Sequence, residues 1–516
     1  MDARKEIKDL VEKAIKDLYG LDFSVQVLSP RGKSHGDFAV SSALEIAKSL
    51  GKDPMPIALE IKNKIDGGIF ENVETVEPGF INFFFSSDLI KRELIDVLKQ
   101  GFKSLDVGQG RKVQVEFISA NPTGPLTVGN ARGGPFGDVL GNVFKRAGYE
   151  VEKAYYVNDY GNQILSLGHS ILKDSEDGYA GKYIDELALQ IKEKDPYVAG
   201  RKGAKIILEG IKKTVERLGI EYDEWFLESE LHEKGEIEKT IDLLRKKGFV
   251  YEKEGALWFE STLFNDERDR VLIKMDEEKT YLAGDIAFHR YKFEEKKFDK
   301  VINVWGADHY GDVAGLKGGV EALGYKNKLE VVLLQFVTVV KEGKPVKMSK
   351  RLGTAITMDD LLEELSPDVI RFFFLESSAN THLNFDMDLA KEQSEKNPVF
   401  YVQYAYARIC SILRKAEGFK EAQSLSLLKE KRELELMKEV LRFRDVVEDT
   451  VKDYQLQRIP QYAISLAEAF HGFYQDCQVL VEDENLKNQR LNLVLGVKIA
   501  LKSVLDLMGV SAPEEM

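Results

Sequence analysis

The chain has 516 residues, of which 43% are hydrophobic and 31% charged, the composition of a globular protein. Since domains usually hold roughly 100 to 200 residues, three or four folding units are expected. A net charge of −14 argues against a protein that coats nucleic acid non-specifically, because such binding depends on many Lys and Arg contacts with phosphate.

The first 107 residues predict a small α+β domain. Apolar residues recur at helical spacing over residues 5–18, a second helical stretch begins near Ser41, and an apolar run covers residues 80–85. The opening MDARKEIKDL has neither an apolar core nor a small-residue cleavage site, and no apolar run approaches the roughly 20 residues that span a bilayer. We therefore expect a cytoplasmic protein without a membrane partner.

From Arg111 the pattern changes. Val113, Val115 and Phe117 alternate with polar residues, which predicts a strand, and the Pro/Gly-rich ANPTGPLTVGNARGG that follows predicts a loop and a helix start. Short strands are also expected at 256–259, 301–305 and 331–340. Alternating strands and helices predict a parallel sheet in a domain of residues 108–365, with a helical, highly charged insertion at about 165–255.

Residues 366–516 predict a helical bundle. Ser366 and Pro367 have the pattern of an N-cap followed by Pro at the first helical position, and the pattern beyond them is almost wholly helical. Cys410 and Cys477 lie far apart, and no Cys/His cluster has the spacing of zinc ligands. Reduced thiols and no zinc or other metal site are expected.

The first chemical motif is Pro125-Leu126-Thr127-Val128-Gly129-Asn130-Ala131-Arg132. A strand-to-helix junction presents free backbone N–H groups and the positive end of a helix dipole, both of which suit a triphosphate. Gly129 lets a base or ribose lie close to the backbone, and Thr127 and Asn130 can donate hydrogen bonds to phosphate oxygens. Taken alone, an ordinary glycine-containing turn explains the motif equally well.

The second motif is Lys347-Met348-Ser349-Lys350-Arg351, with glycines on both sides at Gly343 and Gly353. Two lysines on such a loop can neutralise the charge that develops as pyrophosphate leaves. Taken alone, a solvated basic loop is the simpler explanation.

Together the two motifs resemble the paired signatures of class I aminoacyl-tRNA synthetases. Residues 119–126 and 157–164 are similar to segments of the arginyl enzymes, and Asp368-Val369-Ile370-Arg371 resembles their anticodon-domain signature. The resemblance spans nearly the whole chain. It implies a multidomain α/β protein with a Rossmann-type catalytic domain between an N-terminal additional domain (1–107) and a C-terminal all-α anticodon-binding bundle (366–516).

The first signature departs from the family at Thr127, where His is usual, while the family accepts Asn130 beside His. A missing imidazole removes a donor aimed at phosphate, worth roughly 1 to 3 kcal/mol if nothing replaces it. A catalytically retired paralogue is therefore one alternative, against which the intact lysine loop argues.

Arginine is a planar cation with five donors, so a selective pocket needs carboxylates that receive it in a forked geometry. The resemblance assigns this role to Asp285 and Glu228. It implies four groups of site residues: Thr127, Asn130, Lys347 and Lys350 for catalysis; Pro125, Gly129, Gly306, Asp308, His309, Met348 and Ser349 for ATP; Ser119, Asn121, Glu228, Tyr281 and Asp285 for arginine; and Phe80, Asn82, Tyr401, Tyr404 and Met516 for tRNA. Outside these motifs, His169, His232 and His471 are predicted to be structural.

The resemblance implies activation of L-arginine with ATP and Mg²⁺ to an arginyl-adenylate, transfer to tRNA(Arg) with release of AMP and pyrophosphate, and a monomer. It further implies that activation itself requires bound tRNA. A small-cofactor adenylyltransferase shares the logic of the first motif, but such enzymes are short. Glutamyl and cysteinyl synthetases are alternatives within the fold, and the N-terminal domain, the lack of a zinc cluster and the acidic candidates argue against them.

Overall fold

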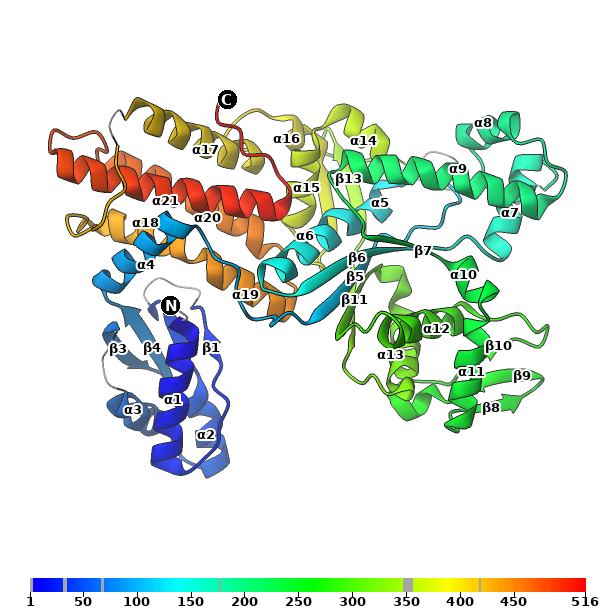
Figure 1. Ribbon diagram of the computed structural model, residues 1–516, viewed down its shortest axis with the longest axis horizontal. Helices are drawn as coiled ribbons and strands as arrows, with labels where there is room; N and C mark the ends of the chain where they lie inside the picture. The colour runs from blue at the N-terminus through cyan, green and yellow to red at the C-terminus, as the bar shows by residue number, and fades with distance from the viewer. Residues whose placement is uncertain (1–2, 31–34, 66–68, 176–177, 347–355, 417–418) are drawn as a thin grey trace.

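The computed structural model describes residues 3–30, 35–65, 69–175, 178–346, 356–416 and 419–516 (Figure 1). Within these residues the buried apolar side chains form three clusters. One lies in the N-terminal domain, a large one is shared by the central sheet and the C-terminal helices, and the third lies beneath the other face of the sheet. No described helix combines the length and the apolar character needed to cross a membrane.

The N-terminal domain is α+β, as the sequence predicts. Its four strands form one antiparallel sheet in the order β1-β2-β4-β3. The domain core runs from Ile7 to Phe83, and its elements are α1 (Ala3–Tyr19), β1 (Val27–Leu28), β2 (Phe38–Val40), α2 (Ser42–Leu50), α3 (Pro54–Lys64), β3 (Phe70–Val76) and β4 (Phe80–Phe85). The following helix, α4 (Ser87–Gln100), packs on α18 (Lys431–Leu441) and α21 (Glu484–Met508) of the bundle, so the compact N-terminal unit ends before the predicted boundary at 107.

Ion pairs fasten the N-terminal domain to the C-terminal helices. The buried Arg4 of α1 donates to Asp445 at 3.0 Å and to Asp449 at 2.9 Å, both on α19 (Phe443–Asp453). Lys438 of α18 pairs with Asp37 at 2.8 Å. The two domains therefore lie side by side although hundreds of residues separate them in the chain (Figure 1).

The centre of the molecule is a five-stranded parallel sheet in the order β12-β11-β5-β6-β7. From β5 the chain adds β6 and β7 on one side, then returns to add β11 and β12 on the other, so β5 and β11 flank a topological switch point. The predicted parallel α/β sheet is confirmed. Its elements are β5 (Lys112–Phe117), α5 (Val128–Ala131), α6 (Gly133–Arg146), β6 (Glu150–Val157), β7 (Glu224–Leu227), α12 (Tyr281–Glu294), β11 (Lys300–Gly306), the 3-10 turn η3 (Ala307–His309), α13 (Tyr310–Leu323) and β12 (Leu329–Leu334).

The predicted insertion at about 165–255 is not one continuous unit, because β7 lies inside it and pairs with β6 in the central sheet. The strand predicted at 256–259 exists as β9 but belongs to a separate antiparallel sheet, β10-β9-β8. The remaining elements of this region are α7 (Asn162–Leu172), α8 (Lys182–Gln190), α9 (Pro196–Arg217), α10 (Glu228–Glu233), α11 (Glu236–Lys246), β8 (Val250–Lys253), β9 (Ala256–Phe259), the 3-10 turn η2 (Ser261–Phe264) and β10 (Arg270–Ile273).

The C-terminal part is a helical bundle that begins where the sequence predicts. Ser366 caps α15, its side chain accepting the backbone N–H of Val369, and Pro367 holds the first helical position. One strand, β15, departs from the all-helical prediction, since it pairs in parallel with β13 of the catalytic region. The catalytic region ends with β13 (Val337–Lys341), β14 (Lys344–Pro345) and α14 (Met358–Glu364). The elements of the C-terminal part are α15 (Pro367–Leu375), β15 (Leu383–Asp386), α16 (Met387–Lys391), α17 (Pro398–Lys415), α18, α19, α20 (Arg458–Asp476) and α21.

The guanidinium of Arg371 joins this bundle to the catalytic region. It is fully buried, donates to the backbone carbonyl oxygen of Met508 at 2.7 Å and to that of Leu218 at 3.0 Å, and forms an ion pair with Asp138. Asp138 also forms an ion pair with Lys153, whose Nζ lies 2.6 Å from Asp138 Oδ1. Helices α6, α9, α15 and α21 thus meet at one planar cation.

Replacement of Arg371 by Met should destabilise the protein by about 3 to 5 kcal/mol, because it leaves buried carbonyl groups and part of a buried carboxylate without a partner. The measurement is the urea midpoint, followed by tryptophan fluorescence. The matched control is Arg217→Met, because Arg217 pairs with Asp359 at 2.7 Å but its side chain is 41% exposed, so at most about 1 kcal/mol should be lost. Equal losses in the two variants would contradict the assigned role of Arg371.

Candidate functional site

Several residues predicted for ATP and arginine lie at the carboxyl edge of the central sheet. Ser119 follows β5, Glu228 follows β7, and Gly306 ends β11. Because parallel strands end at the same edge, and because β5 and β11 flank the switch point, this edge is where an open α/β sheet binds ligands.

The first motif folds into the predicted strand, loop and helix start. Thr127 is the N-cap of α5: its hydroxyl oxygen accepts the backbone N–H of Asn130 at 3.4 Å, and its hydroxyl donates to Asn130 Oδ1 at 2.6 Å. The Thr127 donor is therefore used within the turn in this conformation. A direct hydrogen bond from Thr127 to phosphate requires its hydroxyl to rotate away from Asn130.

Gly129 faces open space. A Cβ atom built on it would meet only Thr127 Oγ1, at 4.0 Å, and the backbone φ of Gly129 is not positive. Neither packing nor backbone conformation within the protein demands glycine here. Glycine at this position is explained instead by a ligand that lies against the backbone, which is the role predicted for Gly129.

The chain after the second motif is bonded to the first. Val128 N donates to Ile356 O at 3.2 Å, and Met358 N donates to Leu126 O at 2.7 Å. Thr127 and Thr357 form an isolated antiparallel bridge. The predicted site residues Lys347, Met348, Ser349 and Lys350 themselves lie outside the described residues, but Ile356, the next described residue after them, already lies beside the first motif.

A strained turn leads from β5 into the site. Ile118 and Ser119 have φ values of +65° and +42°, a region that a β-branched residue rarely adopts. The Ser119 hydroxyl donates to Glu116 Oε1 at 3.2 Å and accepts the backbone N–H of Tyr156 at 3.1 Å. Strain of this kind persists where the surroundings fix the backbone, commonly at functional sites. Here it directs the chain, with Asn121 two residues on, across the ends of β5 and β6.

Glu228 is a buried carboxylate, 7% exposed, at the first position of α10. With its side-chain amide oriented so that its oxygen no longer faces acceptors, Asn158 donates to Glu228 Oε2 at 2.8 Å and to Tyr160 O at 3.2 Å. On the other side lies α12, where a Cβ on Gly284 would stand 3.6 Å from Glu228 Oε1. Helix α12, which carries Asp285, therefore passes within van der Waals distance of this carboxylate at Gly284.

Asp285 shares one face of α12 with Tyr281, His289 and Lys292, at spacings of one helical turn. Burial of most of its carboxyl group, with the nearby negative charges of Glu116 and Glu228, raises its pKa to about 8 against the opposing effect of Lys292. Lys292 is fully buried and already paired with Glu116 at 2.5 Å. The cluster therefore holds more carboxylates than cations among the described residues.

His289 adds no positive charge to the cluster. Burial and the neighbouring ammonium of Lys292 lower its pKa well below the usual value, so its imidazole is neutral. Its Nδ1 lies 2.7 Å from Asp285 O and its Nε2 lies 3.0 Å from the side-chain nitrogen of Asn303. The histidine thus fastens the Asp285 turn of α12 to β11.

Sequence reasoning missed three residues of this site. Tyr156, partly buried near the end of β6, has its pKa raised well above the usual value by desolvation and by the nearby Glu228 and Asp285, among others, so its phenol lies among these acidic groups. Glu116 alternates with apolar residues on β5, a pattern typical of a solvent-facing position, yet it is 5% exposed. His232, predicted to be structural, stacks on Tyr160 with 3.8 Å between ring centroids and lies 3.8 Å from Glu228 Oε1. It is part of the wall of the site.

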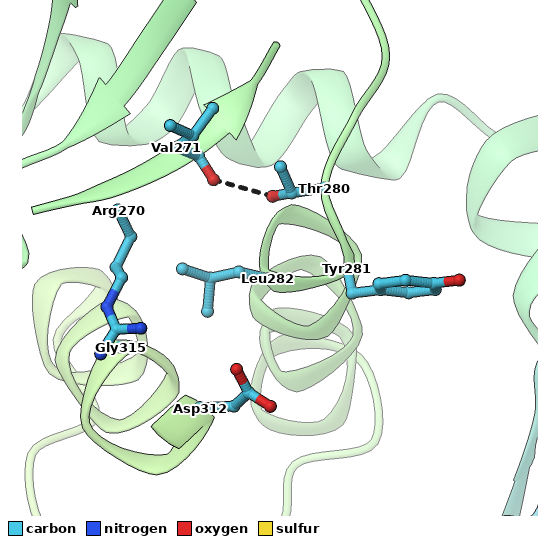
Figure 2. A pocket seen from close by; sticks show the side chains of 7 residues that line it. All are labelled: Arg270, Val271, Thr280, Tyr281, Leu282, Asp312 and Gly315. Carbon is cyan, nitrogen blue, oxygen red and sulfur yellow. Dashed lines mark hydrogen bonds between the residues drawn. The ribbon is translucent and has the colours of Figure 1, made fainter. Parts of the chain in front are cut away.

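Tyr281 begins α12 and is 59% exposed. Burial raises the pKa of its phenol, and the negative charge of Glu228 nearby raises it further. Beside it is a cavity of about 240 Å³ between β10 and the first turns of α12 and α13 (Figure 2). Figure 2 shows the Tyr281 ring directed away from Leu282 and Asp312, which line the same cavity.

The ribose candidates Asp308 and His309 lie on η3, directly after Gly306. Their side chains are 67% and 56% exposed, and His309 Nδ1 lies 3.6 Å from Asp312. The Trp305 ring supports the imidazole with 5.6 Å between centroids. Both polar groups therefore remain accessible to a ligand at the end of β11.

The predicted tRNA residues lie in the two outer domains. Phe80 is partly exposed, but Asn82 is 3% exposed within β4, which counts against direct contact with RNA. On α17, Tyr404 is 44% exposed, while Tyr401 packs against His471 with 5.2 Å between rings. Met516 is 55% exposed, but the adjacent Glu515 pairs with Arg414, at the other end of α17 from Tyr401.

Both thiols, Cys410 and Cys477, are buried and free, as predicted. Among the described residues, no three His, Cys, Asp or Glu side chains are grouped so as to hold a metal ion. The sheet edge thus has two parts. One is a helix start with an exposed glycine, and the other is a group of residues in which carboxylates outnumber cations. These features suit a phosphate group and a cation, respectively.

Three family models match consecutive parts of the chain. An arginyl-tRNA synthetase N-terminal domain matches residues 5–85, a class I (R) tRNA synthetase catalytic domain matches 93–193 and 178–371, and a DALR anticodon binding domain matches 402–516. These matches contradict the alternatives of a small-cofactor adenylyltransferase and of a glutamyl or cysteinyl synthetase.

Full-length relatives agree. The arginine–tRNA ligase of Caldanaerobacter subterraneus subsp. tengcongensis is 44% identical over 555 residues, covering 100% of this chain and 99% of the relative. That of Bacillus subtilis is 40% identical over 557 residues, covering 100% of both. The solved Thermus thermophilus arginyl-tRNA synthetase shares the fold, with a TM-score of 0.85 at 24% identity over 100% of both chains. The chain therefore belongs to the arginyl-tRNA synthetase family and has a class I catalytic domain.

Proposed function

We propose that the protein activates L-arginine with ATP and Mg²⁺ and esterifies it to tRNA(Arg), acting as a monomer in the cytoplasm. Besides the family, one observation carries the choice of arginine. Glu228 and Asp285 lie together at the sheet edge that holds the first motif, and among the described residues the one buried lysine of that cluster is already paired with Glu116. A cation with forked donors completes this arrangement.

In the proposed reaction, Glu228 and Asp285 hold the guanidinium, Tyr281 packs against it, and Ser119 and Asn121 lie where the amino-acid end would be. The arginine carboxylate then attacks the α-phosphate of ATP in line, and the terminal adenosine hydroxyl of tRNA attacks the resulting adenylate. No covalent enzyme intermediate is needed, so positioning and charge stabilisation supply the rate.

The ATP side of the site combines the first motif with the end of β11. Pro125 and Gly129 leave room for the nucleotide, and Gly306, Asp308 and His309 offer polar groups to its ribose. Thr127 and Asn130 form the phosphate-binding turn. Lys347 and Lys350, with Met348 and Ser349 between them, are assigned to the leaving pyrophosphate on sequence grounds.

Contacts with tRNA are assigned to the outer domains. Phe80 and Tyr404 expose aromatic surface on which unpaired bases can stack. Tyr401 and Met516 remain candidates for the anticodon site. Asn82 is the weakest of the proposed tRNA residues, because it is buried in β4, a strand paired on both sides.

The experiment that tests this function is aminoacylation of total tRNA with each of the twenty amino acids in turn. Only arginine should be esterified, and arginine-dependent ATP–pyrophosphate exchange should appear only when tRNA is added. A Lys350→Ala variant separates a synthetase from a catalytically retired paralogue. In a synthetase the substitution should lower the rate of tRNA charging, whereas a retired paralogue should show no charging in either form. Charging with another amino acid, or none with active tRNA, would refute the proposal.

Substitution of Glu228 by Gln should raise the KM for arginine roughly tenfold to a hundredfold, because one charge-assisted hydrogen bond is worth about 1.5 to 3 kcal/mol. The KM for ATP should change less than about twofold. The matched control is Glu230→Gln on the same helix, where Glu230 pairs with Lys234 at 2.6 Å and its side chain is 40% exposed. An unchanged arginine KM in Glu228→Gln would remove this residue from the pocket.

Arginine binding should strengthen as the pH rises towards 8. Asp285 has its pKa raised to about 8 in the ligand-free protein, so near pH 7 it is largely protonated, and a guanidinium binds the ionised form. The facing groups Glu116, Glu228 and Lys292 set this pKa, while His289 is neutral and adds no titration in this range.

The expected result is a proton released on arginine binding at pH 7 and almost none at pH 9. Calorimetry in two buffers of different ionisation enthalpy, with tRNA present, measures this number directly. Asp285→Asn should bind arginine more weakly and lose the pH dependence. If wild type and variant release protons alike, Asp285 is not the titrating group.

A further inference from the structure

Arg132 lies two residues beyond the Thr127–Asn130 turn, at the junction of α5 and α6, and its side chain is 2% exposed. No role has been assigned to it above. Because it is almost completely buried, it cannot itself touch ATP, and any effect it has on the reaction must act through the groups that it contacts.

Its guanidinium is bonded to backbone carbonyl groups from two other segments. It donates to Gln335 O, to Thr381 O at 3.1 Å and to Ser378 O at 3.0 Å. Gln335 lies between β12 and β13, and the other two acceptors lie in the loop before β15. These two segments are themselves joined, since Gln335 N donates to Ala379 O at 2.9 Å.

The charge of Arg132 is not balanced by an acid. Over the part of the chain that the structure describes, its hydrogen-bond partners are carbonyl oxygens, and its Nε is a buried donor without a partner. Burial lowers its pKa to about 10, with no carboxylate acting against that shift, so the guanidinium remains charged at neutral pH. A buried cation without an acid is costly, and a purely structural clamp between these segments does not require a charge.

The contacts join the phosphate-binding turn to a neighbouring part of the same sheet edge. On one side is the phosphate-binding turn, and on the other is the end of β12, where Phe336 is 59% exposed at the carboxyl edge of the sheet. Their separation is fixed by a planar group with directional donors. A small shift of such a turn has a large effect on an in-line reaction, which depends on the alignment of the reacting atoms.

We propose that Arg132 is a positioning residue for adenylate formation, which holds the Thr127–Asn130 turn in place against the β12–β13 connection and adds an unbalanced positive charge behind it. This inference rests on the proposed function. Lysine cannot replace it, because one ammonium group cannot donate to three carbonyl oxygens in the plane that the guanidinium spans.

The test compares Arg132→Lys with Arg146→Lys in ATP–pyrophosphate exchange with tRNA present. Arg146 is a matched control: it lies on the same helix α6, donates to the carbonyl oxygen of Phe102, and has its pKa lowered by burial. For each variant the kcat, the KM for ATP and the thermal midpoint are measured.

For Arg132→Lys we expect kcat, measured well below the thermal midpoint of the variant, to fall at least tenfold while the KM for ATP changes less than threefold. Arg146→Lys should keep kcat within twofold. If Arg132→Lys does not fold, Arg132→Gln, which keeps a planar donor, is judged by the same criteria.

Two outcomes would overturn the inference: a kcat within threefold of wild type in the Arg132 variant, or losses of kcat that follow the loss of thermal midpoint equally in both variants. A wild-type protein without arginine-dependent exchange would instead refute the proposed function, whatever the variants do.

Discussion

The site depends on carboxylates that the protein alone does not neutralise. Glu116 has Lys292, but Glu228 and Asp285 lie beside each other with a hydrogen-bond donor from Asn158 and no described cation between them. Like charges in a buried setting cannot all ionise, so in the free protein Asp285 is largely protonated at neutral pH. A forked cation removes that conflict, and an uncharged side chain of similar size leaves it in place. In the proposed function, selection of arginine therefore follows from the excess of carboxylates over cations among these residues.

Sheet topology explains why this pocket and the phosphate-binding turn share one edge. The sheet extends outward from β5 on one side and from β11 on the other, and all five strands are parallel. Their carboxyl ends therefore lie at one edge. The turn after β5 reaches the phosphate region only because Ile118 and Ser119 adopt left-handed backbone conformations, held by the bonds from Ser119 to Glu116 and Tyr156. Glu116 therefore serves both halves: it balances Lys292 under the arginine pocket and anchors the chain that enters the nucleotide region.

Local sequence patterns correctly predicted those strands and helix starts that are determined by interactions within a few residues. The strand before the first motif, the helix start at Thr127 and the Ser366 cap all follow from hydrogen bonds within a few residues. Strand β7 was missed because its four residues lie in a charged, helical stretch and its pairing with β6 is a tertiary contact. Glu116 was not recognised as a site residue for the same reason, since its partner Lys292 lies on another element. The burial of Asn82 likewise depends on strands that pair only in the folded domain.

Three buried guanidinium groups connect parts of the chain that are far apart in sequence. Arg4 joins α1 to α19, Arg132 joins α5 to the β12–β13 connection, and Arg371 joins α15 to α6 and α21. Apolar surfaces alone can slide over one another, because dispersion and hydrophobic contacts have little direction. A guanidinium bonded to several fixed acceptors allows one orientation, and lysine would not reproduce it. In the proposed function the outer domains contact a long RNA while the centre aligns the reacting atoms, and directional joints of this kind hold those parts in a fixed relation.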